Sequence, residues 1–194
     1  ALTSGSALVT LKPTTNATAI QVGTGATDAA GVLGLDNTEL AAITSTGGLT
    51  IGSATNTGGI TVVGAASAAG VTGGTLTLQS NSGNIAVNDT LTGAVNTTLT
   101  TASGNITFDP NGAVSAAGKT VTLTATAGNI EGDAAAFTNV TASTLNATGS
   151  SGIGNINAIE TVVSTLAFAN TTNKVQVTNT LAGGVTVSGT TTTN

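Results

Sequence analysis

The most constraining feature of this sequence is a short motif, apolar–Thr–apolar, that recurs along most of its length. Each copy places two apolar side chains on one face of an extended strand and a β-branched hydroxyl residue on the other. Glycine, asparagine and serine, which favour turns, separate the copies. Strands this short bury too little apolar surface to be stable alone, so they must stack on one another. The copies are Leu49-Thr50-Ile51, Ile60-Thr61-Val62, Leu76-Thr77-Leu78, Ile106-Thr107-Phe108, Val121-Thr122-Leu123 and Val185-Thr186-Val187.

A longer period lies above this strand pattern. The tripeptide Gly-Asn-Ile occurs four times, at successive spacings of 21, 24 and 26 residues. A repeat of this length that holds two or three short strands has the size of one coil of a β-solenoid, whose coils stack about 4.8 Å apart through parallel ladders. The four copies begin at Gly83, Gly104, Gly128 and Gly154.

The two periods together predict an all-β protein, folded as a right-handed parallel β-helix (the handedness is discussed below). We expect a single β-solenoid domain over residues 1–194, with about eight or nine coils and a length of roughly 40 Å. An antiparallel β-sandwich is the alternative, because it also has short alternating strands. It does not, however, require Gly-Asn-Ile to return at a coil-like interval.

The repeat also predicts which side chains stack along the axis. We expect the asparagine of each copy to form a ladder at one turn, as stacked asparagines do in cross-β assemblies. These residues are Asn84, Asn105, Asn129 and Asn155. The phenylalanines lie more than one coil apart, which indicates core fillers rather than a binding platform. They are Phe108, Phe137 and Phe168.

One segment departs from the strand pattern. Asp36 precedes Glu39 by three residues, which is the spacing of a helix-capping box. Leu40 and Ile43 then fall on one face of a helix. We therefore expect one short helical turn near residues 37–43, between two coils.

Composition excludes most functional classes. Charged residues make up 6% of the chain, and it contains no Cys, His, Arg, Trp or Tyr. It therefore offers no histidine base, thiolate, disulfide or zinc site. The net charge of −5, with lysines only at Lys12, Lys119 and Lys174, argues against nucleic acid as a partner. We expect no enzymatic activity, no cofactor, and no catalytic or metal-binding residues.

Three short segments imitate functional sites and are better explained as turns. Asp109-Pro110-Asn111-Gly112 lacks the terminal glutamate of a calcium loop, so we expect an ordinary turn. Gly23-Thr24-Gly25 has no lysine after it and is not a phosphate loop. Glu131 and Asp133 have the spacing of a weak cation site or an acid pair, but nothing is present to orient a sugar. We expect them to be solvated turn acids.

Two surface roles remain to be weighed. Seven glycosylation sequons occur, about the number that a composition so rich in Thr and Ser gives by chance, so glycosylation is open. They lie at Asn16, Asn88, Asn96, Asn105, Asn139, Asn146 and Asn170. Pairs of Thr-x-Thr, as in antifreeze solenoids, can bind ice where they form a regular array. Because the coils vary from 21 to 26 residues, we expect an irregular array and no ice binding. The pairs are Thr75/Thr77, Thr98/Thr100 and Thr122/Thr124.

The segment Leu35–Val62, LDNTELAAITSTGGLTIGSATNTGGITV, resembles a recurring block in very large bacterial surface proteins of the filamentous-haemagglutinin type. Thr120–Ile130 and Lys174–Gly189 look like degenerate repeats of the same proteins. The resemblance implies a right-handed β-helix, export across the outer membrane, and a role in adhesion or an extracellular matrix. No counterpart of the amino-terminal secretion domain is found, so it implies a repeat region only. The matching positions are Glu39, Leu40, Ile43, Leu49, Ile51, Gly52, Gly59, Ile60, Thr61 and Val62.

We therefore expect a structural building block of a bacterial extracellular filament, surface layer or biofilm matrix, assembled by β-solenoid stacking. Low charge removes the repulsion that keeps β-rich proteins apart, and a solenoid slice has unpaired strand groups at its ends. The alternative is a stalk segment of a secreted haemagglutinin-type adhesin that binds cells or glycans. The apolar stretches are too short to span a membrane, and the start at Ala1 favours a processed product or a piece of a larger protein.

Overall fold

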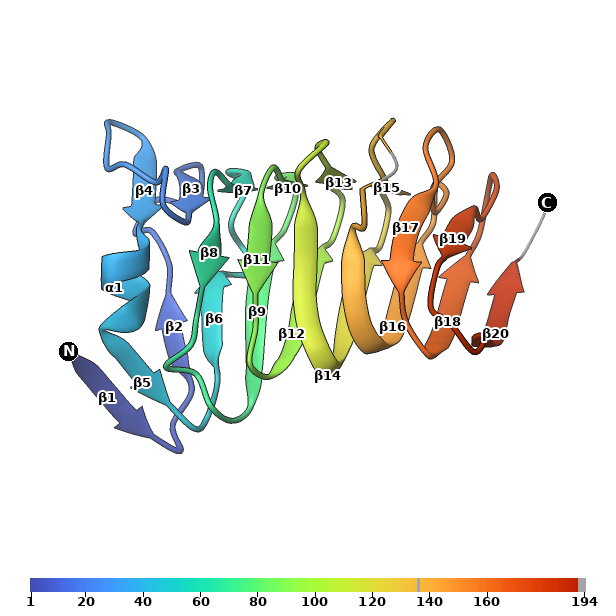
Figure 1. The fold of residues 1–194 in the computed structure, drawn as a ribbon. Helices are drawn as coiled ribbons and strands as arrows, with labels where there is room; N and C mark the ends of the chain where they lie inside the picture. Colours follow the sequence, from blue (N-terminus) through green and yellow to red (C-terminus); the bar gives the residue numbers. More distant parts are fainter. Residues whose placement is uncertain (136, 192–194) are drawn as a thin grey trace.

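The computed structural model of the protein describes residues 1–135 and 137–191. Its strands pair in parallel and stack along one axis as an elongated β-solenoid, with the chain running from the N-terminal to the C-terminal end of the rod (Figure 1). The predicted parallel solenoid is therefore confirmed, and the antiparallel sandwich is wrong. An isolated bridge between Ala29 and Val32 is antiparallel, whereas every ladder of paired strands in the described residues is parallel.

Three ladders of strands form the walls of the rod. The first ladder runs through β2 (Val9–Leu11), β6 (Leu49–Gly52), β9 (Thr75–Ser80), β12 (Asn96–Thr101), the second half of β14 (Ala113–Ala125), the second half of β16 (Val140–Gly149), β18 (Thr165–Asn170) and β20 (Thr186–Thr191). The second runs through β4 (Val32–Leu35), β3 (Ala19–Val22), β7 (Ile60–Val62), β10 (Ile85–Val87), β13 (Ile106–Phe108) and β15 (Ile130–Glu131). The third runs through β8 (Ala66–Ser67), β11 (Thr90–Thr92), the first halves of β14 and β16, β17 (Ile159–Val162) and β19 (Val177–Asn179).

The chain completes about six turns, fewer than the eight or nine expected. Register partners along the first ladder give the length of each turn: they are Leu49, Leu76, Thr97, Val121, Leu145, Leu166 and Val187, and successive members lie 27, 21, 24, 24, 21 and 21 residues apart. The turn before them is longer, because Val9 pairs with Leu49, 40 residues on. That turn contains β4, a helix and long loops, so residues that the periodicity assigned to two coils make only one.

The N-terminal end of the rod carries the predicted helix. α1 spans Asn37–Ala41, and Asp36 and Glu39 form the expected capping box, each side chain bonded to the other's backbone N–H. Nearby, β1 (Leu2–Gly5) pairs with β5 (Ile43–Ser45). Leu40 is buried, so α1 packs onto the first coils (Figure 1).

Alternation within the strands builds one continuous apolar core. In β9 and β12 the residues that face inward are buried, while those between them are partly exposed. Leu78, Leu99 and Leu123 pair with one another across coils and form one of the inward columns. A column of this kind is stabilised by burial on every side, because each leucine also contacts the coils above and below it.

The phenylalanines separate into two groups. Phe108 is buried and Phe168 packs against the core, as expected of core fillers. Phe168 fills the space beside Ala147 and Gly189, its partners in the neighbouring coils; a methyl group on Gly189 would lie 2.6 Å from the Phe168 ring. The expectation for Phe137 is wrong, since it is 41% exposed on the loop between β15 and β16.

Candidate functional site

The Gly-Asn-Ile turns form a ladder over the first three copies. The Asn84 side chain accepts the backbone N–H of Asn105 through Oδ1 at 2.9 Å, and Asn105 accepts that of Asn129 at 3.1 Å. The bonds run from side chain to backbone rather than from amide to amide. Each therefore closes one coil on the next and satisfies a backbone donor at an exposed corner.

The fourth copy does not join this ladder, so the expectation for Asn155 is wrong. Ile130 bridges to Ile153 instead of Ile156, and the Ile130 N–H donates to the carbonyl of Gly152. Gly152-Ile153 thus occupies the place that Gly154-Asn155-Ile156 was expected to take. Ile156 is consequently displaced onto a surface loop, where it is 74% exposed.

Glu131 is a structural residue, and the expectation of a solvated turn acid is wrong. Its exposed fraction is 8%. One carboxylate oxygen accepts from the Asn129 amide at 2.8 Å, and the other accepts the N–H of Ile156 at 2.9 Å and that of Asn157 at 3.4 Å. The carboxylate therefore holds the displaced loop of the next coil, which explains how a charged group is accommodated inside a corner.

Asp133 is also buried, with 6% of its surface exposed, and it likewise departs from the solvated state we expected. It accepts the backbone N–H of Ala135 and the Nδ2 group of Asn139, the latter at 3.3 Å. Both carboxylates are thus occupied by bonds within the fold. Neither faces a cleft in which a substrate would reach it.

Asn139 links three successive coils and was not singled out from the sequence. It is fully buried and donates through Nδ2 to the Gly112 carbonyl at 3.3 Å, while its Oδ1 accepts the Glu160 N–H at 3.1 Å. Burial, followed by the nearby charge of Asp133, raises the pKa of the Glu160 carboxyl. The separation of 21 residues between Asn139 and Glu160 is one coil, and that spacing is the signal that would have connected them.

The remaining sequence candidates are turns or buried side chains. Gly112 donates to the Asp109 carbonyl at 2.7 Å, and Ala26 donates to that of Gly23 at 2.9 Å, so both expected turns are confirmed. Among the sequons, Asn139 and Asn170 have exposed fractions of 0% and 4%. A glycan cannot be carried at either position in the folded chain, because the amide is enclosed.

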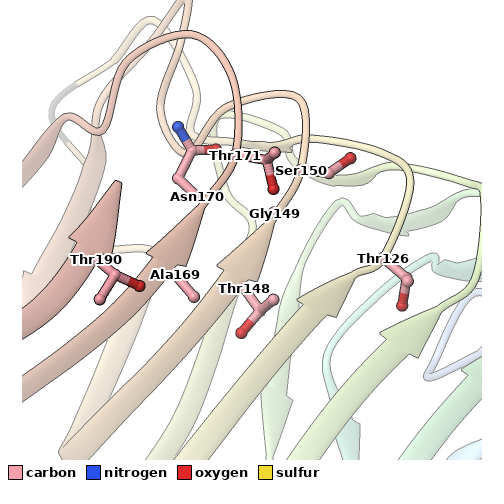
Figure 2. Close-up of a pocket in the computed structure, with 8 residues that line it drawn as sticks. All are labelled: Thr126, Thr148, Gly149, Ser150, Ala169, Asn170, Thr171 and Thr190. Carbon is pink, nitrogen blue, oxygen red and sulfur yellow. The ribbon is translucent and has the colours of Figure 1, made fainter. Parts of the chain in front are cut away.

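A small hollow of about 140 Å³ lies where three strands of the first ladder end. Figure 2 shows Thr148, Ala169 and Thr190 on β16, β18 and β20, with Ser150 and Thr171 on the turns beyond. The lining holds hydroxyl and methyl groups and no titratable side chain. It therefore supplies no acid, base or nucleophile of the kind that catalysis uses.

A larger hollow, of about 530 Å³, opens at the C-terminal end of the rod. It is lined mainly by the apolar side chains of the last coils, together with Asn173, Lys174 and Thr191: Leu166, Phe168, Val175, Val177 and Val187. All six residues of β20 are exposed, and Val187 is 55% exposed. The expectation that Val185-Thr186-Val187 buries an apolar pair is therefore wrong, because no layer covers this strand in the described residues.

The outward side of the first ladder carries a regular array of threonines, which we call the Thr face. Its central column is Thr10, Thr50, Thr77, Thr98 and Thr122, each paired with the next in the coil ladder. The expectation of an irregular array is wrong. Differences in coil length are absorbed at corners, as at the register shift between Ala116 and Thr120, and the pairing on this face is continuous.

Comparison with known proteins finds no matching family model, no matching curated protein and no matching solved structure. Within residues 1–135 and 137–191, no three acidic side chains gather where they could hold a metal ion. Across the same residues, no helix has the length and hydrophobicity to cross a membrane.

Proposed function

We propose that the protein is a structural building block of a bacterial extracellular filament, surface layer or matrix, assembled by stacking of β-solenoid coils. The observation that carries this proposal is the last layer of the rod. There β20 pairs on one side only, with β18, and an apolar hollow of about 530 Å³ opens beside it.

Both features are suited to another parallel coil. Unpaired strand groups at an edge are a template for further pairing, and apolar side chains such as Leu166 and Val187 gain stability when they are covered. The next layer is either a further coil of the same protein or the first coil of a second copy. A head-to-tail contact of the second kind does not close on itself and therefore produces a filament.

Chemistry along the walls agrees with a structural role. The buried polar groups that recur at the corners, including Ser80 and Thr101, bond to the backbone of the adjacent turns. Charged side chains are few, at 6% of the residues, so neighbouring rods repel one another little. The resemblance of Leu35–Val62 to filamentous-haemagglutinin repeats supports an extracellular location on the same footing.

Electron microscopy of the purified chain at rising concentration tests this proposal. We expect filaments with an axial repeat of roughly 40 Å, the rise of eight stacked strands. Val187→Glu places a charge in the open layer and is expected to abolish filaments, whereas Thr126→Glu, on an exposed corner in the middle of the rod, is expected to leave them intact.

Isolated short rods at every concentration would contradict self-assembly. They would favour the stalk of a haemagglutinin-type adhesin, in which the open layer is covered by the following coil, and screening of cell surfaces and glycans would come next. Filaments of Val187→Glu as long as those of the unaltered chain would show that the open layer is not the contact.

A further inference from the structure

We propose that the Thr face binds ice. The inference goes beyond the proposed function, because it concerns the side wall of the rod and does not depend on what covers the ends. It begins from register: the central column holds five threonines on five consecutive strands, although their separations in sequence are 40, 27, 21 and 24 residues. Coil length and side-chain register are thus uncoupled on this face.

Flanking columns extend the array in the second direction. On one side Thr100 pairs with Thr124, and Thr124 with Thr148. On the other side Thr120 pairs with Thr144, and Thr144 with Thr165, followed by Thr186. Neighbouring strands lie about 4.8 Å apart, and residues two apart on one parallel strand lie about 6.6 Å apart. Both repeats are close to the oxygen spacings on the prism plane of hexagonal ice.

The hydroxyls of this array differ from those inside the rod. Thr101 donates to the carbonyls of Asn81 and Gly83, and Thr97 donates to that of Val95. Within the described residues, the hydroxyls of Thr77, Thr98 and Thr122 make no hydrogen bond to the chain, so water must satisfy them. Because threonine is restricted at χ1, the waters bound to successive rungs are held in a repeating arrangement.

The chemistry of the face selects the ligand. Its columns contain no charged residue, and the lysines nearest to it in sequence, Lys12 and Lys119, lie after β2 and at the bend of β14. The chain has no Trp or Tyr on which a sugar ring could stack. A flat lattice of hydroxyl and methyl groups that repeats in two directions matches a solid that also repeats in two directions, and water is the ligand that its hydroxyls already require.

The array has a definite boundary along the rod. After Thr122 the central column continues with Asn146, Ala167 and Ser188. At Ala167 and Ala169 the surface is hollowed, with a depression of about 180 Å³. Ice contact is therefore assigned to the wall between β2 and β14, with the C-terminal coils outside it.

Thermal hysteresis and inhibition of ice recrystallisation, measured on the purified chain, test the proposal. We expect both activities, and we expect Thr98→Lys to lose most of them because it places a long charged side chain in the centre of the array. The matched control is Thr107→Lys, which makes the same change at a partly exposed threonine of β13 on the second ladder, and it is expected to keep full activity.

A gentler variant covers the case in which Thr98→Lys fails to fold, as judged by circular dichroism. Thr98→Ser keeps the hydroxyl but removes the methyl group and the restriction at χ1, and it is expected to lower both activities. The proposal is overturned if the unaltered chain shows neither activity, or if Thr107→Lys reduces them as much as Thr98→Lys does.

Discussion

The two ends of the rod differ in how the last layer is covered. At the N-terminal end, Leu40 of α1 is buried over the first coils. The Asn37 amide takes the place of a neighbouring strand beside β8, donating to the Ala65 carbonyl at 2.9 Å and accepting the Ser67 N–H at 3.0 Å. At the C-terminal end, no comparable group lies over β20 in the described residues, and Val187 is 55% exposed.

This difference teaches what the strand pattern does and does not specify. Leu76-Thr77-Leu78 and Val185-Thr186-Val187 carry the same alternation, and in both the register places the apolar residues on the inner side. The leucines have exposed fractions of 1% and 0%, because coils lie above and below them. Alternation therefore determines which way a side chain points, whereas burial depends on the presence of a next layer.

Truncating one apolar side chain at each end should show the largest effect. Leu40→Ala is expected to lower the free energy of unfolding by about 2–5 kcal/mol, because it leaves a cavity in a covered layer. Val187→Ala should change it by less than about 0.5 kcal/mol, since the side chain is exposed. Denaturant unfolding of the dilute, unassembled chain measures both, and equal losses would show that the two ends are covered alike.

Removal of the helix cap should have a smaller effect at the covered end. Asp36→Ala deletes the acceptor for the Glu39 N–H, a bond of 2.9 Å, and is expected to cost about 1 kcal/mol. The control is Asp109→Ala, an exposed acid in a turn between coils, which should be nearly neutral. Hydrogen exchange would localise the effect: faster exchange of the amides of α1 is expected, and unchanged exchange would mean that packing alone holds the helix.

The comparison also explains how far the sequence could predict the fold. The coil period, the parallel stacking and the capping box at Asp36 are all local or periodic signals, and each was correct. The number of coils was overestimated because the first turn, from Val9 to Leu49, holds inserted elements that periodicity cannot separate from coils. Coil count therefore needs the pairing itself.

The errors at the candidate sites have a common physical cause, namely competition between nearby registers. Ile153 and Ile156 both follow a Gly-containing turn, and only pairing with Ile130 decides which one enters the core. Once Ile153 does so, Ile156 moves to a loop that Glu131 then holds. The burial of Glu131 is thus a consequence of a contact across 25 residues, for which the residues around it give no signal.

The smallest predicted effect concerns Glu160, on β17 near the open end. Burial, and after it the charge of Asp133, raises the pKa of its carboxyl above the ordinary value of 4.5. The folded chain therefore binds this proton more tightly than the unfolded chain does. The contribution of Glu160 to stability is fully present below the ordinary pKa and is lost as pH rises through the raised one.

Glu160→Gln removes this ionisation and should slightly raise the melting temperature at pH 7, with no gain at pH 4, where the carboxyl is largely protonated in the folded chain. Asp109→Asn is the control, because that acid is exposed and its turn is closed by a backbone bond. Melting curves at both pH values check the sign. A lower melting temperature for Glu160→Gln at pH 7 would mean that the ionised carboxylate stabilises the corner, and that layers near the open end tolerate charge as the covered layers do not.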